Sequence, residues 1–171
     1  MKAHALLTAL AAAAAIAAAA PAAEITRFMA AGPTPALILQ GVLVPAGADT
    51  FYLSGQLASP IDPAKPMSPT LAVEDFGDTK TQTISVLTKI KALLASHGYA
   101  LSDVIKMTVF VAGDAKLGGK MDFAGMNDGY KQFFGTTENP NVVARSTIQV
   151  AALAAPWALV EIEVTAAKMP K

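Results

Sequence analysis

Hydrophobic residues recur every three or four positions between Asp78 and His97, which is the spacing of an amphipathic helix. Lysines occupy other positions in this segment. Asp78 can cap the start of the helix, and Gly98 can supply the left-handed residue beyond its end. The apolar positions are Ile84, Leu87, Ile90, Leu93 and Leu94.

A second helix is predicted from about Asp122 to Phe134, because apolar and aromatic residues repeat at the same spacing before Gly135. Alternation and β-branching predict strands at about 36–44, 50–55, 103–112, 142–150 and 157–167. This order of elements predicts an α+β fold in which both helices cover one face of a mixed β-sheet.

Two further segments affect this prediction. Residues 56–78 contain four prolines, each of which removes a backbone donor, so we expect one long loop. The strand Val104–Val111 is apolar except at Lys106 and Thr108, which predicts that both of its faces are buried. Self-association would bury the face that the helices leave uncovered.

The N-terminus has the pattern of a secretory signal peptide. Met1-Lys2 is positively charged, the stretch Leu6–Ala20 is apolar, and Ala20-Pro21-Ala22 is a small-residue cleavage site. An uncleaved anchor is disfavoured because the apolar run is shorter than the roughly 20 residues that span a bilayer. We therefore expect a signal peptide at 1–22, a single domain at 23–171, and a periplasmic or secreted protein that has no membrane association after cleavage.

Composition excludes several classes of function. The chain has 171 residues, no cysteine, and 13 basic against 13 acidic residues; removal of Lys2 leaves 12 − 13 = −1. The two arginines and the scattered lysines argue against a nucleic-acid partner. After cleavage the only histidine is His97, at a predicted helix end. Cys-His nucleophiles and Cys/His or two-histidine metal sites are therefore excluded.

Arg145 interrupts an apolar strand, where a guanidinium needs an anion. That anion could be a protein carboxylate or a ligand. Glu161 and Glu163 alternate with apolar residues, so both carboxylates share one face of a strand. They could form a polar outer face, or one could handle a water molecule. The segment Gly113–Met121 is one residue too long for a phosphate-binding loop and reads as a flexible surface loop.

Five segments in order resemble the YjgF/RidA family, over about residues 36–167. The C-terminal pair is Val143–Thr147 followed by Val160–Glu163. The other three are Ser54-Gly55-Gln56, the run Asp103–Val111, and Asn127 with Tyr130 and Phe133-Phe134.

The resemblance implies a chorismate-mutase-like fold and a homotrimer with a ligand pocket at each subunit interface. It also implies hydrolysis of reactive enamines and imines, such as 2-aminoacrylate, to 2-oxo acids and ammonia without metal or cofactor. Arg145 would hold the carboxylate of a small imine substrate, and Glu161 would position the attacking water. Ser54, Gly55 and Asn127 match residues at the family's pocket.

Two positions depart from the family pattern, and both touch the pocket. Ile38 stands where family deaminases often have a tyrosine, and Thr147 where they often have a cysteine. The loss of the tyrosine hydroxyl favours an alternative function, a non-catalytic module that binds small carboxylates. An endoribonuclease activity, the label of some relatives, is disfavoured by the near-zero charge.

Overall fold

The computed structural model describes residues 23–32, 36–68 and 70–170. The predicted signal peptide at 1–22 lies outside these residues. Within the described ranges, no helix has both the length and the apolar character needed to cross a membrane.

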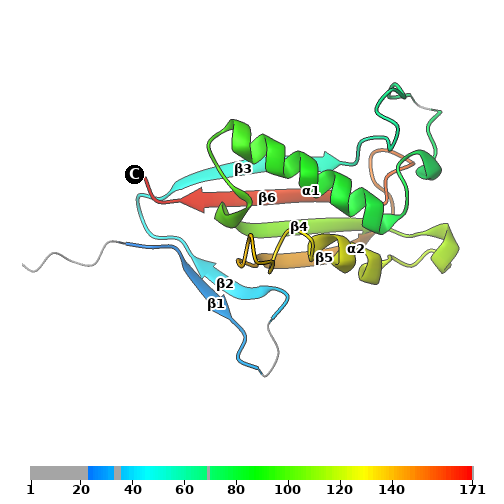
Figure 1. Ribbon diagram of the computed structural model, residues 1–171. Coiled ribbons are helices and arrows are strands. Elements are labelled where there is room, and N and C mark those ends of the chain that lie inside the picture. Colours follow the sequence, from blue (N-terminus) through cyan, green and yellow to red (C-terminus); the bar gives the residue numbers. More distant parts are fainter. Residues whose placement is uncertain (1–22, 33–35, 69, 171) are drawn as a thin grey trace, which may run out of the picture.

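A mixed sheet forms one layer of the protein, and two helices form the other (Figure 1). Its strands lie in the order β3 (Asp49–Leu57), β6 (Val160–Lys168), β4 (Val104–Ala112) and β5 (Ala144–Val150). β6 pairs antiparallel with both β3 and β4, whereas β4 and β5 are parallel. The predicted α+β architecture with a mixed sheet is therefore confirmed.

Helices α1 (Thr79–Ser96) and α2 (Phe123–Tyr130) both cover the same face of this sheet (Figure 1). The core between the layers includes Val86, Leu87 and Ile90 of α1 and alternate residues of β4 and β6. The opposite face carries no helix among the described residues, as the sequence predicted, and we call it the bare face.

The N-terminal part differs from the prediction. The strand expected at 36–44 is β2 (Leu39–Leu43), and it pairs with β1 (Thr26–Met29) in a separate two-stranded antiparallel sheet rather than joining the main sheet. The sequence did not predict β1, because four residues are too few to establish a period. β2 begins beside β5, where the Leu39 N–H donates to the carbonyl of Val143 at 2.9 Å.

The boundaries of α1 agree with the prediction. The Asp78 side chain accepts a hydrogen bond from the Thr81 N–H, and Gly98 has a φ of 75°. His97 is the residue that ends the helix, as expected. α2 ends at Tyr130, four residues before the predicted end at Phe134. The backbone after Tyr130 forms turns, yet Phe134 still packs into the core, where its ring stacks on Tyr130 with centroids 4.9 Å apart. The apolar spacing therefore runs past the end of the helix.

The long loop predicted at 56–78 begins two residues later, because β3 extends to Leu57. It contains a short 3-10 helix at Val73–Asp75, and its C-terminal end packs against the core of the domain. The Phe76 ring stacks on Trp157 with centroids 3.6 Å apart. Lys65 forms an ion pair with Asp75, which ties the middle of the loop to its base.

Candidate functional site

Arg145 lies on the face of the sheet that the helices cover. It pairs across the sheet with Met107, a core residue, so both side chains point toward the helix layer. Its Nη2 donates to Oδ1 of Asn127 at 2.6 Å. The guanidinium carbon lies 4.4 Å from the centroid of the Tyr130 ring, and Nη1 lies 3.8 Å from the sulfur of Met126. Three residues of α2 thus hold the guanidinium.

None of these partners carries a negative charge. Among the described residues, no carboxylate oxygen lies within 4.0 Å of the Arg145 guanidinium. Burial lowers the pKa of Arg145 below its ordinary value, and Tyr130 partly opposes this shift. An arginine nevertheless remains protonated at neutral pH. The sequence left open whether a protein acid or a ligand balances this charge, and within the described residues no protein acid does so.

Two further predicted residues lie on or beside β5, the strand that carries Arg145. Thr147 is two positions further along β5 and so shares its face, and its hydroxyl oxygen is buried without a hydrogen-bond partner among the described residues. Ile38 precedes the Leu39–Val143 hydrogen bond and is 36% exposed, so it lies beside the start of β5. We call Ile38, Asn127, Arg145 and Thr147 the arginine half-site.

Glu161 lies on the bare face instead. It pairs with Phe110 of β4, between the core positions Val109 and Val111. On its other side it pairs with Leu57 of β3. Glu163, two positions along β6, is exposed on the same face, as predicted. Neither glutamate has an ion-pair partner among the residues that the structure describes.

A β-bulge brings the backbone of β3 against Glu161. Leu53 pairs with Val164 and Gln56 pairs with Ile162. Ser54 and Gly55 therefore both lie opposite one residue of β6, Glu163. A Cβ atom on Gly55 would lie 1.9 Å from Oε1 of Glu161, so only glycine permits this approach. We call Ser54, Gly55 and Glu161 the glutamate half-site.

The single chain does not bring the two half-sites together. The β4 partners of Arg145 and Glu161 are Met107 and Phe110, which are three positions apart along that strand. An odd separation places the two side chains on opposite faces. It also separates them by about 10 Å along the strand direction.

The segment Gly113–Met121 forms a closed loop rather than a phosphate cradle. Asp114 N–H donates to the carbonyl of Lys120 at 3.0 Å. The Gln149 side chain accepts from Met121 N–H at 3.0 Å and donates to the carbonyl of Gly119 at 2.8 Å. Its polar backbone groups are therefore used internally, which agrees with the prediction of a surface loop.

Sequence reasoning missed the role of Tyr130 and Met126 as supports for the arginine. The apolar spacing of 122–134 places both on one helix face, and the family resemblance includes Tyr130 without giving it a role. The signal was available in their spacing, because Met126, Asn127 and Tyr130 fall on one side of α2. Within the described ranges, no group of three or more His, Asp or Glu side chains could hold a metal ion.

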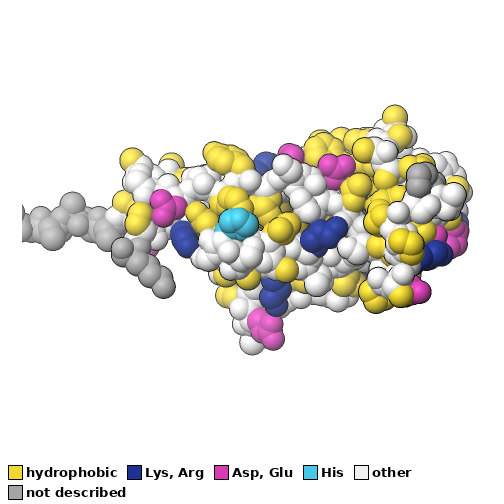
Figure 2. Space-filling view, turned by 90° about the horizontal axis from the view of Figure 1, so that it is seen from above, with side chains coloured by type: hydrophobic (Ala, Val, Ile, Leu, Met, Phe, Trp, Pro, Cys, Tyr) yellow, Lys and Arg dark blue, Asp and Glu magenta, His cyan; other side chains and the backbone are white. Residues whose placement is uncertain are grey.

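Charged side chains are dispersed on the surface that Figure 2 shows. On this side, seen from above Figure 1, lysine and arginine side chains are scattered among acidic and neutral groups. The coloured residues of this view therefore form no continuous basic patch of the kind that binds nucleic acid.

Comparisons with known proteins agree on one family. The model of the family described as endoribonuclease L-PSP matches residues 41–168. A RutC family protein of Pyrococcus horikoshii is 38% identical over 118 residues, which cover 69% of this chain and 79% of that protein.

Solved structures show the same fold. Escherichia coli TdcF, solved with bound serine, is 32% identical with a TM-score of 0.53, over 83% of this chain and 93% of TdcF. The Rid family protein YyfB of Yersinia pestis is 24% identical with a TM-score of 0.61, over 84% of this chain and 98% of YyfB. The chain therefore has the chorismate-mutase-like fold that the family resemblance implied.

Proposed function

Because the chain belongs to the endoribonuclease L-PSP family, also called the YjgF/RidA family, we propose that it hydrolyses small carboxylate-bearing imines and enamines to 2-oxo acids and ammonia. The observation that carries this proposal is the uncompensated charge of Arg145, held in place by neutral groups of α2. A substrate carboxylate supplies the anion, in the bidentate geometry that a guanidinium favours.

The relatives support a small carboxylate as the ligand. TdcF carries the provisional name of a reactive intermediate deaminase, and it is 38% identical to this chain over 76 residues. Its structure was solved with bound serine, an amino acid whose carboxylate is of the required kind.

The proposal requires more than one copy of the chain. In a homotrimer, the arginine half-site of one subunit faces the glutamate half-site of the next, and each interface holds one pocket. The bare face supports such an association because it exposes large hydrophobic side chains, among them Tyr52 at 75% and Ile148 at 47% exposure. A second copy would cover these side chains and complete the site.

In the assembled pocket, Arg145 fixes the substrate so that its imine carbon faces a water molecule next to Glu161. Glu161 accepts a proton from this water as the oxygen bonds to the carbon, and it passes this proton to the nitrogen, which gives a carbinolamine. Glu161 then transfers the hydroxyl proton of this carbinolamine to its nitrogen, the carbon–nitrogen bond breaks, ammonia leaves, and the carbon becomes the carbonyl of a 2-oxo acid. The half-sites divide the work, since one binds the substrate and the other activates the water.

The residues around Arg145 favour substrates with a small apolar side chain. Ile38 presents an apolar surface, and Thr147 contributes one hydroxyl group. Ile38 also favours a second candidate function, the binding of small carboxylates without turnover. Because the sequence predicts a signal peptide, we place either activity outside the cytoplasm, where oxidation of amino acids would supply the imines.

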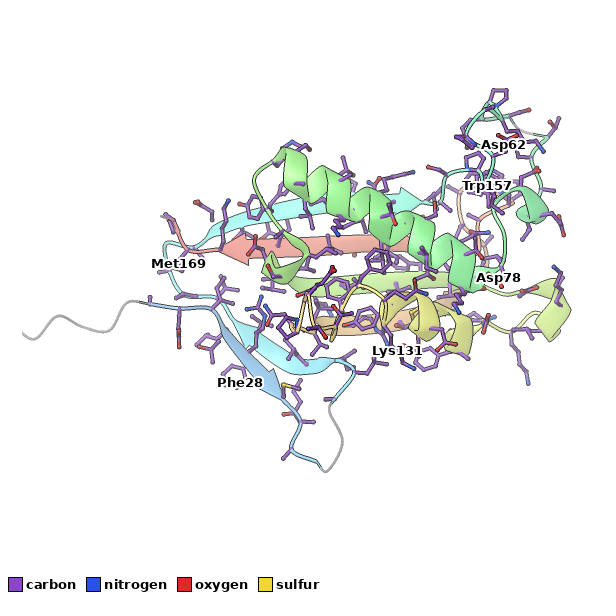
Figure 3. The ribbon with its side chains drawn as sticks, viewed as in Figure 1. Phe28, Asp62, Asp78, Lys131, Trp157 and Met169 are labelled. Carbon is purple, nitrogen blue, oxygen red and sulfur yellow. The ribbon has the colours of Figure 1, made fainter. Side chains whose placement is uncertain are left out.

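Trapping of free imines tests this proposal. An amino-acid oxidase generates the imine, semicarbazide traps what remains, and the mature protein is added as wild type or Arg145→Ala. Lys131→Ala is the matched control, because Lys131 is an exposed cation at the end of α2, the helix whose residues contact Arg145 (Figure 3). Wild type and Lys131→Ala should suppress trapping, and Arg145→Ala should not.

If wild type leaves trapping unchanged for a broad set of amino acids, the deaminase proposal fails. Calorimetric titration with pyruvate then tests the second candidate. Binding that Arg145→Ala abolishes would support a carboxylate-binding module.

A further inference from the structure

Helix α1 carries a row of three polar side chains that face the sheet. Gln82, Ser85 and Lys89 are separated by three and four residues, so they lie on one side of the helix. All three bond to backbone atoms outside the helix. Polar side chains are unexpected at these positions, because apolar side chains could pack the helix against the sheet equally well.

Gln82 holds the start of β6. Its side chain is fully buried, and Nε2 donates to the carbonyls of Gly77 at 3.1 Å and Trp157 at 3.2 Å. Its Oε1 accepts from the N–H of Leu159 at 2.9 Å. Trp157 lies at the end of the molecule where α1 begins, near Asp78 (Figure 3). These bonds fix the segment that leads directly into Glu161.

Ser85 and Lys89 hold the end of β3. The Ser85 hydroxyl accepts from the N–H of Ser59 at 3.0 Å, and Nζ of Lys89 donates to the carbonyl of Leu57 at 2.7 Å. Lys89 is partly buried, and this burial lowers its pKa below the ordinary value. No carboxylate within the described ranges lies within 4.0 Å of it. Partial burial of an ammonium group that has no carboxylate partner costs free energy, and the hydrogen bond to the Leu57 carbonyl offsets part of that cost.

These contacts converge on the glutamate half-site. Leu57 is the cross-strand partner of Glu161, and the bulge at Ser54 and Gly55 lies just before it. We propose that Gln82, Ser85 and Lys89 are positioning residues that keep the Glu161 carboxylate against the Gly55 backbone. The catalytic part of this inference rests on the function proposed above for Glu161.

Substitutions at Lys89 test the inference with the full mature protein. Lys89→Met keeps the length of the side chain and removes the bond to Leu57, whereas Lys89→Arg keeps a donor. Lys91→Met is the matched control, because Lys91 is exposed on the same helix. Lys89→Met should lower kcat by roughly 10- to 100-fold, since small misplacements of catalytic groups have effects of that size. KM should stay within about twofold, because the arginine half-site is unchanged. Lys89→Arg should restore most of the kcat, and Lys91→Met should match wild type.

A second measurement does not depend on catalysis. Amide hydrogen exchange at residues 53–57 and 161–164 should become roughly tenfold faster in Lys89→Met, with no change in Lys91→Met. If wild type fails to hydrolyse imines, the proposed function is wrong, while exchange still decides whether Lys89 fixes the strands. Unchanged exchange in Lys89→Met would overturn the positioning role. So would a lowered kcat that Lys89→Arg does not restore.

Discussion

Arg145 and Glu161 project from opposite faces of the same sheet. Arg145 packs against Asn127 and Tyr130 of α2, whereas Glu161 lies on the bare face beside Gly55. Neither residue can therefore assist the other within one chain. This arrangement explains why Glu161 forms no ion pair with the guanidinium within one chain, and it makes contact between subunits a requirement of the proposed chemistry.

Glu161→Gln should abolish most turnover while sparing binding. The amide cannot accept the proton of water, so kcat should fall by roughly 100-fold or more. Affinity for pyruvate should stay within about twofold of wild type, because Arg145 is untouched. Steady-state deaminase assays and calorimetric titration measure these two quantities.

Glu163→Gln is the control for this substitution, since Glu163 is exposed on the same face two residues away. It should behave like wild type. Equal losses of kcat in both variants would mean that general charge on this face matters, rather than a specific role of Glu161.

Gly55→Ala should displace the Glu161 carboxylate. The new methyl group would lie 1.9 Å from Oε1 and 3.0 Å from Cγ of Glu161, so the side chain must move. We expect kcat to fall by roughly 10- to 100-fold. A crystal structure of the variant would show the new position of the carboxylate.

Gly41→Ala provides the comparison, because a Cβ there meets no atom within 4 Å and the backbone angle is ordinary. Its activity should equal that of wild type. Full activity in Gly55→Ala would show that the close approach of Gly55 to Glu161 is not needed for catalysis.

Local sequence patterns predicted the helix layer well. Apolar spacing, the Asp78 cap and Gly98 together defined α1 at both ends. The pairing of β2 with β1, away from the main sheet, was not predictable, because alternation within one strand does not specify its partner.

The sequence likewise predicted only part of the candidate site. Period two correctly placed Glu161 and Glu163 on one face. It could not relate that face to the side chain of Arg145, because this relation depends on how β4 pairs with both neighbouring strands. The separation into two half-sites therefore emerged only from the register of the sheet.

Asp78→Ala should destabilise the protein in a pH-dependent manner. Hydrogen bonds from the Thr81 side chain and backbone hold the pKa of Asp78 below its ordinary value. The resulting stabilisation is fully present above the ordinary carboxyl pKa and is lost as the pH falls through the lowered value. At pH 7 the variant should lose about 1 kcal/mol of unfolding free energy, the usual contribution of a helix cap.

Urea unfolding at pH 7 and at about pH 3 compares the two conditions, since a free aspartate titrates near pH 4. The difference between Asp78→Ala and wild type should shrink at the lower pH. The difference between Asp78→Asn and Asp78→Ala should be the same at both pH values, because asparagine caps the helix without titrating. An equal deficit of Asp78→Ala at both pH values would contradict the titration of this cap.

Mixing two inactive variants tests the assembly of the site most directly. Arg145→Ala keeps an intact glutamate half-site, and Glu161→Gln keeps an intact arginine half-site. If each pocket takes one half-site from each of two neighbouring subunits, an equal mixture of exchanged trimers should regain about a quarter of wild-type activity. Native mass spectrometry would confirm that mixed trimers have formed. Mixed trimers that remain as inactive as either parent would contradict a pocket shared between subunits.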